Sequence, residues 1–375
     1  MKIIIVGTAY PFRGGIAHFN SLLAQYLMKN HEVEIITFTR QYPKLFFPGK
    51  TQAETGGEPP TVSVKQMIDS INPLNWFRVV KEIRKSKPDF LIFKYWLPFF
   101  GPCFGTIAKY AKKNSNIKVL FICDNVIPHE RRPGDIAFTK YAFKQSDYFL
   151  VQSKSVETDL LSLFPNAKYK FAPHPVYEIF GSSIDKIQAR KILSINSERV
   201  ILFFGYIRQY KGLMVLLDVI NEISKRETPP LLLVVGEFYD DESKYRNRVK
   251  ELDIGNYVQF VSDYIPNDKV NIYFSAADVI VLPYLSATQS GITQIAYNFD
   301  KPVIATEVGG LSEVVINQKT GYIVKPGNPL PLAEAIIKFY QGKKEQEFSE
   351  NVKIEKRKYS WEHFVKTIIE LVQKS

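Results

Sequence analysis

The 375-residue chain contains little cysteine and lacks any long apolar run. Its two cysteines, Cys103 and Cys123, lie in unlike contexts without the spacing of a metal site, which argues against a disulfide framework and favours a reducing compartment. No segment approaches the roughly 18 apolar residues that a membrane-spanning helix requires. The short apolar run that opens the chain predicts a β-strand rather than a signal peptide. We therefore expect a soluble, cytoplasmic protein.

A second absence is local, because residues 284–299 hold no Asp or Glu although a small-residue loop there precedes an apolar helix pattern. Ser290, Gly291 and Ile292 are expected to form the first helical turn, whose N–H groups have no intrahelical partner. Gly291 lets an oxyanion approach without a Cβ in the way. The segment therefore predicts an anion site, and an ordinary serine-containing helix start is the alternative.

Negative charge is also scarce in the first half of the chain. Residues 1–176 contain 24 Lys and Arg against 13 Asp and Glu, whereas residues 177–375 contain 25 of each. This asymmetry indicates that the first half meets an anionic partner or surface, with ordinary solubility charge as the alternative. No nucleic-acid recognition motif accompanies the charge, so nucleic acid is not expected as a partner.

Short buried-strand patterns alternate with helix-length segments in two sets of five, which is typical of parallel sheets covered on both faces. We predict an α/β protein with two doubly wound, Rossmann-like domains facing across a cleft, at residues 1–176 and 177–358. A Pro- and Gly-punctuated stretch near the boundary supports the division. A C-terminal helix at residues 359–375 is expected to cross back and pack on the body through an apolar stripe. In such folds ligands bind outside the carboxyl ends of the strands.

Two more loops after predicted strands could hold phosphate. Arg208 and Lys211 follow the strand VILFFG at a strand-to-helix turn, where cations and free backbone N–H groups meet. Gly14 and Gly15 open a helix after the first strand, but no GxGxxG fingerprint is present there. A solvated basic turn and a simple tight turn are the respective alternatives.

Several motifs recur along nearly the whole chain, most clearly from residue 200 to residue 326. They are PFRGGIAHFNSLLAQYL, DNVIPHE, SDYFLVQSKSV, FFGYIRQYKG, AADVIVLPY, PVIATEVGGLSEVV and TGYIVKPGN. In their order and spacing they resemble the retaining nucleotide-sugar glycosyltransferases of the GT-B fold, family 4. The resemblance implies that Arg208 and Lys211 grip the donor pyrophosphate while the backbone at residues 290–292 holds its phosphates.

The resemblance also implies where the rest of the donor binds. Gly15, with Gly14, would reach the donor from the N-terminal domain, and the base would lie near Gly236 and around Ser262–Tyr264. Such enzymes need no cofactor and no metal, because Arg, Lys and the helix end neutralise the leaving diphosphate.

The sequence departs from the family pattern at two places. Family members usually carry two Glu residues around the phosphate helix, at positions that here fall on Ala287 and Ile295. The adjacent Gln294 could bind a ribose hydroxyl if the register slips by one. Many members have Arg directly after the strand-ending Gly, where this chain has Tyr206, and Arg208 follows two residues later.

The acceptor, a glycan or lipid-linked molecule, is expected on the basic N-terminal domain. Members often have a His in contact with the transferred sugar where this chain has Asp124, and His129 in the same loop is a second candidate. Asp124 could also cap a turn or orient an acceptor hydroxyl. Residues 74–88 combine basic and aromatic side chains, which suits a helix lying on an anionic membrane as well as one packed on the sheet.

We therefore expect an enzyme that transfers a sugar from a nucleoside-diphosphate sugar to an acceptor hydroxyl with retention. The resemblance implies a place in bacterial cell-surface polysaccharide or glycolipid synthesis, and the basic N-terminal half suggests a peripheral enzyme at the inner face of the plasma membrane. Two alternatives stay open. A sugar-nucleotide epimerase would need acids and histidines for proton transfer, and a non-catalytic nucleotide-sugar-binding protein would fit the missing Glu pair.

Overall fold

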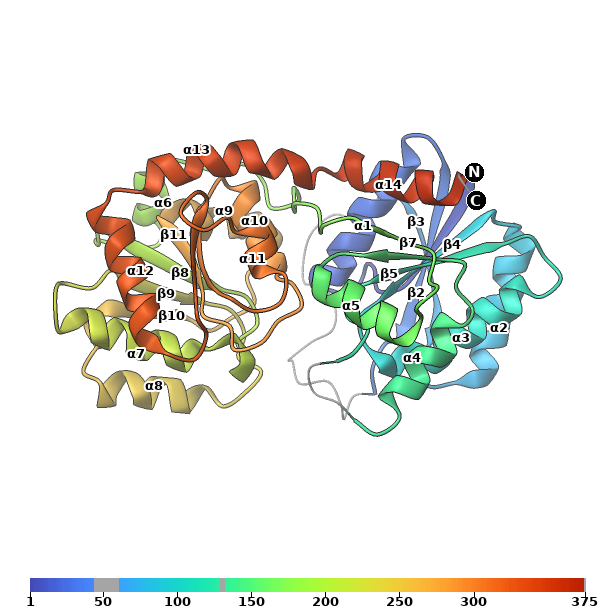
Figure 1. The fold of residues 1–375 in the computed structure, drawn as a ribbon, viewed down its shortest axis with the longest axis horizontal. Coiled ribbons are helices and arrows are strands. Elements are labelled where there is room, and N and C mark those ends of the chain that lie inside the picture. The colour runs from blue at the N-terminus through green and yellow to red at the C-terminus, as the bar shows by residue number, and fades with distance from the viewer. Residues whose placement is uncertain (44–60, 129–131, 374–375) are drawn as a thin grey trace. The chain divides into compact units, whose positions relative to one another are not determined.

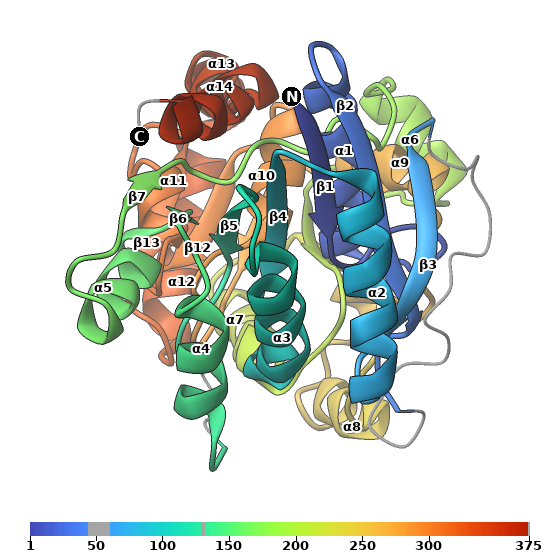
Figure 2. The ribbon, with the colours of Figure 1, turned by 90° about the vertical axis from the view of Figure 1, so that its right-hand side faces the viewer.

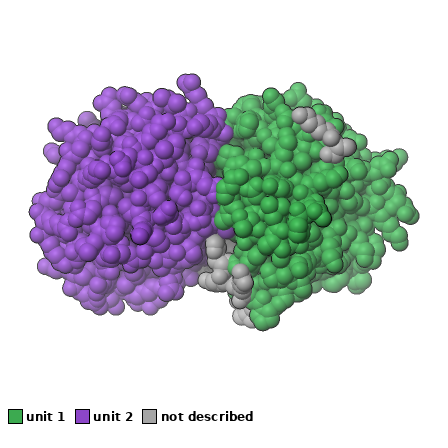
Figure 3. Space-filling model, in the orientation of Figure 1, with its two compact units in different colours: residues 1–175, 360–375 green, residues 176–359 purple. Residues whose placement is uncertain are grey.

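The computed structural model describes residues 1–43, 61–128 and 132–373. The chain divides into two compact units (Figure 3). Unit 1 contains residues 1–175 and 360–375, and unit 2 contains residues 176–359. The chain therefore passes out of unit 1 after Pro175 and returns to it after Tyr359. His129 lies outside the described residues.

The described part of unit 1 (Figure 1) is built on a seven-stranded parallel sheet, whose order β3-β2-β1-β4-β5-β6-β7 can be followed in Figure 2. Its strands are β1 Lys2–Val6, β2 Glu32–Arg40, β3 Ser63–Asp69, β4 Phe90–Tyr95, β5 Lys118–Cys123, β6 Tyr148–Val151 and β7 Tyr169–Phe171. Its helices are α1 Gly15–Met28, α2 Pro73–Ser86, η2 Pro98–Phe100, α3 Gly101–Lys112, α4 Asp135–Phe143, α5 Lys154–Leu163 and α14 Trp361–Gln373.

Both faces of this sheet are covered by helices, as its continuous apolar strands require. Helices α2, α3 and α4 lie side by side on one face (Figure 2). The C-terminal helix α14 packs against α1, where Trp361 stacks on Tyr26 with ring centroids 5.8 Å apart and contacts Phe19 at 5.1 Å. The apolar stripe expected on this helix is buried at Trp361, Phe364, Ile368 and Leu371.

The described part of unit 2 is built on a six-stranded parallel sheet in the order β10-β9-β8-β11-β12-β13. Its strands are β8 Val200–Phe204, β9 Leu231–Val235, β10 Val258–Val261, β11 Val279–Leu282, β12 Val303–Thr306 and β13 Gly321–Val324. Its helices are α6 Lys186–Ile192, η3 Gln209–Lys211, α7 Leu213–Ser224, α8 Glu242–Glu251, η4 Gly255–Tyr257, η5 Asn267–Lys269, α9 Val270–Ala276, α10 Gly291–Asn298, α11 Leu311–Val314, α12 Pro329–Gln341, α13 Glu345–Glu355 and η6 Lys356–Tyr359.

The prediction of two parallel-sheet, Rossmann-like α/β domains is confirmed. In each sheet the chain starts at a central strand, builds outward to one edge, and then returns to build the other side. The reversal lies between β1 and β4 in unit 1 and between β8 and β11 in unit 2. Ligands of doubly wound sheets bind outside the carboxyl ends of the strands at such reversals. The loops after β8 and β11 are therefore the first place to look in unit 2.

Candidate functional site

The loops after β8 and β11 are in direct contact at the carboxyl edge of the sheet in unit 2. Gly212 ends the short helix η3 with φ of 72°, and a Cβ placed on it would lie only 1.9 Å from the carbonyl oxygen of Pro283. No other residue fits this close approach without moving the backbone. The N–H of Leu285 also donates to the carbonyl of Tyr210 at 2.7 Å. The two loops therefore form one surface, which is needed if Arg208, Lys211 and residues 290–292 are to bind the same diphosphate.

Lys211 is the central side chain of this surface. The residue is only 8% exposed, and its Nζ lies 3.2 Å from the position that a Cβ on Gly205 would take. The same position lies 3.1 Å from Cδ1 of Ile292 in the first turn of α10. The ammonium is also 5.7 Å from the ring centroid of Tyr284. The structure thus brings Lys211, Gly205 and Ile292 together.

The charge of Lys211 is not balanced by a described acid. Burial, and to a smaller extent the charge of Arg208, lowers the pKa of Lys211 to about 7. Within residues 1–43, 61–128 and 132–373, no ion pair joins Lys211 to a carboxylate. A buried ammonium without a counter-ion is costly. The location is therefore one where a bound anion stabilises the protein.

Arg208 lies on the outer side of the same loop. Its guanidinium carbon lies 4.9 Å from the ring centroid of Tyr239, and that ring packs at a tilt of 36° on Tyr206 with centroids 4.6 Å apart. Arg208 is exposed, so its side chain can reorient at low cost. Its charge also contributes to the lowered pKa of Lys211.

Helix α10 presents its amino end to this surface. Ser290 is the N-cap residue with extended backbone and no side-chain capping bond, and its Oγ lies 3.3 Å from the hydroxyl of Tyr284. The first turn contains no acid. The N–H groups of Gly291 and Ile292 have no intrahelical partner by position. These amides and Lys211 supply donors of the kind that bind phosphate oxygens.

The remaining donor-site predictions in unit 2 lie around this centre. Gly236 follows β9 and packs so closely on Gly205 that an added Cβ would lie 2.2 Å from the Gly205 carbonyl oxygen. Tyr264 is half-buried in the loop after β10. Gln294 is 2% exposed, and no hydrogen bond reaches its Oε1 within the described residues. Their contact with a base or ribose stays a prediction.

The two positions of the family Glu pair are apolar and buried. Ala287 is 9% exposed and Ile295 is 6% exposed. Neither can accept a hydrogen bond through its side chain. Any recognition of a sugar or ribose hydroxyl at this helix must therefore come from other groups, such as the side chain of Gln294 or the backbone.

In unit 1 the candidates lie at the carboxyl edge of the other sheet. Gly14 has φ of 105° and precedes α1, which begins at Gly15. Asp124 directly follows β5 and is paired with Lys94, whose Nζ lies 2.6 Å from Asp124 Oδ1. Lys94 was missed from the sequence, although a lysine inside the apolar run FLIFKY was a signal that could have found it.

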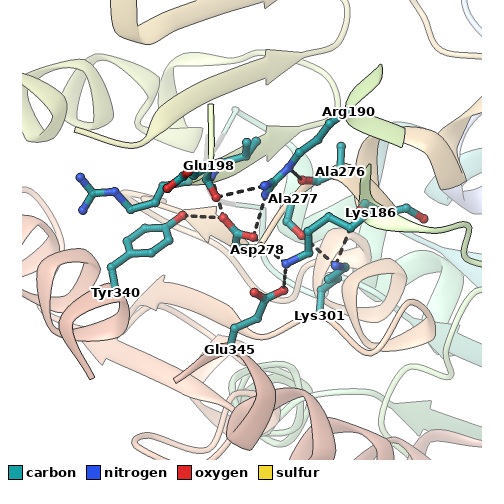
Figure 4. A network of polar contacts seen from close by, with 12 residues as sticks. Lys186, Arg190, Glu198, Ala276, Ala277, Asp278, Lys301, Tyr340 and Glu345 are labelled. Atoms are coloured by element: carbon teal, nitrogen blue, oxygen red, sulfur yellow. Dashed lines mark hydrogen bonds and ion pairs between the residues drawn. The ribbon is translucent and has the colours of Figure 1, made fainter. Parts of the chain in front are cut away.

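A second polar cluster in unit 2 lies at the opposite, amino edge of the sheet (Figure 4). Asp278, just before β11, accepts hydrogen bonds from the N–H of Val200 at 2.7 Å, Lys186 at 2.8 Å and Arg190 at 2.7 Å. A cavity of about 340 Å³ opens beside these residues. Because Lys186 and Arg190 are already neutralised by Asp278, with Glu345 also paired to Lys186, the cluster ties α6, β8 and β11 together.

Residues 185–372, half of the chain, match the sequence model of the family described as Glycosyl transferases group 1. An uncharacterized glycosyltransferase of Methanocaldococcus jannaschii is 25% identical over 399 residues, which cover 98% of this chain and 97% of the relative. D-inositol 3-phosphate glycosyltransferase of Corynebacterium diphtheriae is 28% identical over 203 residues, which cover 51% of this chain and 47% of that enzyme.

Solved structures with the same fold include two with TM-scores near 0.8. Anabaena HepE in complex with UDP-glucose has a TM-score of 0.78 at 16% identity, with 100% of both chains covered. Sucrose-phosphate synthase from Thermosynechococcus elongatus has a TM-score of 0.77 at 18% identity, covering 100% of this chain and 99% of that one. These structures establish the GT-B fold. In the described residues, no helix combines the length and apolar composition needed to cross a bilayer.

Proposed function

Because the chain belongs to the group 1 glycosyl transferases, we propose that it transfers a sugar from a nucleoside-diphosphate sugar to an acceptor hydroxyl with retention of anomeric configuration. The observation that carries the proposal is Lys211, a buried cation with no described acid beside it, adjoining the amino end of α10. A diphosphate supplies the missing negative charge. The complexes of Anabaena HepE with UDP and with UDP-glucose support this class of donor.

The chemistry proposed for unit 2 is charge stabilisation of the leaving diphosphate. Lys211 gives a buried point charge, Arg208 a forked hydrogen-bond donor, and the first turn of α10 adds backbone N–H groups. The acceptor hydroxyl attacks the face from which the diphosphate leaves, and a phosphate oxygen takes its proton. These groups perform the neutralisation that a metal ion performs in other transferases, so we propose a reaction without metal or cofactor.

A binding-only function has one specific observation in its favour, the apolar residues at the positions of the family Glu pair. Ala287 and Ile295 cannot hydrogen-bond the donor through their side chains. A protein of this kind would bind the donor but turn none over. No specific observation favours the epimerase alternative.

A donor panel tests the proposal. Melting temperature and release of nucleoside diphosphate are measured with UDP-glucose, UDP-galactose, UDP-N-acetylglucosamine and GDP-mannose, each with and without a panel of p-nitrophenyl glycosides. We expect one donor to raise the melting temperature through mass action and to give a glycoside product of retained configuration. Stabilisation without turnover would favour the binding-only function, and no stabilisation by any donor would contradict both.

We further propose that unit 1 meets an anionic membrane through α2, which would place the reaction at the inner face of the plasma membrane in cell-surface polysaccharide or glycolipid synthesis. Trp76, Val79, Val80 and Ile83 are buried, so this face of the helix packs on its own unit. Leu74 and Phe77 stay exposed, at 77% and 46%. The exposed cations Arg78, Lys81, Arg84 and Lys85 lie on the same helix, a composition that suits an interfacial helix.

Co-sedimentation with vesicles tests the membrane proposal. The double variant Leu74→Ser/Phe77→Ser is expected to lose binding to phosphatidylglycerol-containing vesicles at low salt. Ile187→Ser, which removes an equally exposed apolar side chain in unit 2 (78% exposed), is the matched control and should bind like the wild type. Wild-type protein that stays in the supernatant would rule the proposal out.

A further inference from the structure

The buried polar cluster around Lys94 in unit 1 has no role in the donor chemistry described above. We infer that Lys94 is a positioning residue that holds the carboxylate of Asp124 in place to accept a hydrogen bond from an acceptor hydroxyl next to the attacking one, whose own proton goes to the leaving phosphate. This inference rests on the proposed transfer reaction and adds the residue that orients its acceptor. The sequence left several roles open for Asp124, and the inference selects the orientation of an acceptor hydroxyl.

The ammonium of Lys94 is held from three directions. Its Nζ lies 2.6 Å from Asp124 Oδ1, 2.7 Å from Gln152 Oε1 and 3.5 Å from the ring centroid of Phe19. The three partners come from the end of β5, the end of β6 and helix α1. A side chain so enclosed has no freedom to bind a substrate, so its effect must pass through the groups that it contacts.

Exposure distinguishes the two members of the ion pair. The Lys94 side chain is 1% exposed, whereas the Asp124 side chain is 14% exposed. Gln152 is also buried, at 4%. Asp124 is thus the member of the cluster whose carboxylate reaches the surface, and it does so where the chain leaves β5 at the carboxyl edge of the sheet. Substrates of doubly wound domains bind along this edge.

Stability alone does not account for the ion pair between Lys94 and Asp124. Removing two charges from water costs several kcal/mol each, and a well-packed apolar residue often replaces a buried ion pair at no loss. Lys94 also faces His174, whose pKa is lowered to about 3 by burial and by the Lys94 charge, so that the imidazole is neutral. The neutral imidazole of His174 therefore adds no second positive charge next to Lys94.

The pair also indicates what kind of acceptor group fits. An Asp124 carboxylate neutralised by Lys94 can accept a hydrogen bond from a hydroxyl, but the pair offers no net positive charge for a phosphate. We therefore assign the reacting end of the acceptor to uncharged, hydroxyl-bearing compounds such as a sugar. A charged group of the acceptor, where present, must lie elsewhere on the basic surface of unit 1.

A double-mutant cycle tests the inference. Wild type, Lys94→Met, Asp124→Asn and the double variant are assayed for transfer from UDP-glucose to p-nitrophenyl glycosides, or from whichever panel donor the wild type uses. We expect each single change to lower kcat/KM for the acceptor roughly 10- to 100-fold, since misplacement by about 1 Å can cost this much. The KM for the donor should not change. The double variant should be no worse than Asp124→Asn, because Lys94 acts only through Asp124.

Matched controls separate positioning from folding. Lys112 pairs with Asp147 at 2.8 Å at the amino edge of the same sheet, so Lys112→Met removes an ion pair of unit 1 away from Asp124 and should leave transfer unchanged. Melting temperatures show whether each variant folds. If Lys94→Met does not fold, Lys94→Gln keeps a hydrogen-bond donor on a side chain one atom shorter, and should lose less activity than Asp124→Asn.

Each outcome decides between two claims. Unchanged transfer by folded Lys94→Met, or by folded Lys94→Gln and Asp124→Asn together, would overturn the inference and leave the proposed function standing. Losses that multiply in the double variant would show that Lys94 acts independently of Asp124, which also overturns it. Absence of transfer by the wild type with every donor and acceptor would overturn the proposed function, and the inference with it.

Discussion

The Nζ of Lys211 lies 3.2 Å from the point where a side chain on Gly205 would begin. Gly205 ends β8 with φ of 99°, so the chain turns there in a conformation that L residues rarely adopt. The missing Cβ leaves the space into which the lysine folds back. The position of the cation therefore depends on the glycine that precedes it by six residues.

Gly205→Ala is expected to weaken donor binding as well as stability. The positive φ costs about 1–3 kcal/mol for a residue with a Cβ, and the new methyl group displaces the Lys211 ammonium and the Ile292 side chain. Gly327→Ala is the matched control, because Gly327 has φ of 84° but no atom within 4 Å of an added Cβ. Thermal melts with and without UDP should show both variants destabilised, but only Gly205→Ala with a reduced response to UDP.

Lys211→Met is expected to stabilise the free protein and to weaken its response to UDP. Methionine keeps the length of the side chain but removes a buried charge without a described counter-ion, and such a charge opposes folding. The lost charge-assisted hydrogen bond should weaken UDP binding roughly 10- to 100-fold. Calorimetry and melting curves measure both effects. Lys325→Met, at an exposed position, should change neither, and a Lys211→Met variant that melts lower and binds UDP as tightly as the wild type would contradict the prediction.

Donor binding is expected to take up a proton above neutral pH. The pKa of Lys211 is lowered to about 7 in the free protein, and a bound diphosphate would raise it by supplying an opposite charge. The affinity for UDP-glucose should therefore be constant below pH 7 and fall by up to about tenfold per pH unit above it. Isothermal calorimetry at pH 8 in buffers of different ionisation enthalpy should give an uptake of about one proton, which Lys211→Met removes. Equal heats in all buffers would exclude this role for the lysine.

The central strands of the fold could be predicted from the sequence, but of the four edge strands only β10 was. Runs such as VILFFG identify strands because central strands of parallel sheets are apolar on both faces. The strands β3, β7 and β13 were missed, and each of them is an edge strand. Strand β3, with the sequence SVKQMID, keeps most of its residues partly exposed, so it carries the polar composition of a loop.

The candidate site was predictable in its residue types but not in its electrostatics. Arg208 and Lys211 could be named from their spacing after a strand. That Lys211 is buried without an acid depends on the loop after β11 closing over it, which no local pattern reveals. Lys94 was missed because a single lysine in an apolar run says nothing about its partners Asp124 and Gln152, which lie 30 and 58 positions along the chain.

Asp278 holds the amino edge of the sheet in unit 2 together, so Asp278→Asn is expected to be strongly destabilising. The carboxylate accepts hydrogen bonds from Lys186, Arg190 and the N–H of Val200, and its side chain is 5% exposed. Breaking a buried pair by removing one partner costs about 3–5 kcal/mol, because the other charge is left unpaired.

Glu222→Gln is the control. It removes an acid from the pair Lys225–Glu222, whose lysine is 57% exposed, and should cost less than about 1 kcal/mol. Urea titrations compare the two free energies of unfolding. Since the network lies at the edge opposite Lys211, Asp278→Asn protein that remains folded should still be stabilised by UDP, and a loss of that response with little change in stability would show that the cluster belongs to the donor site.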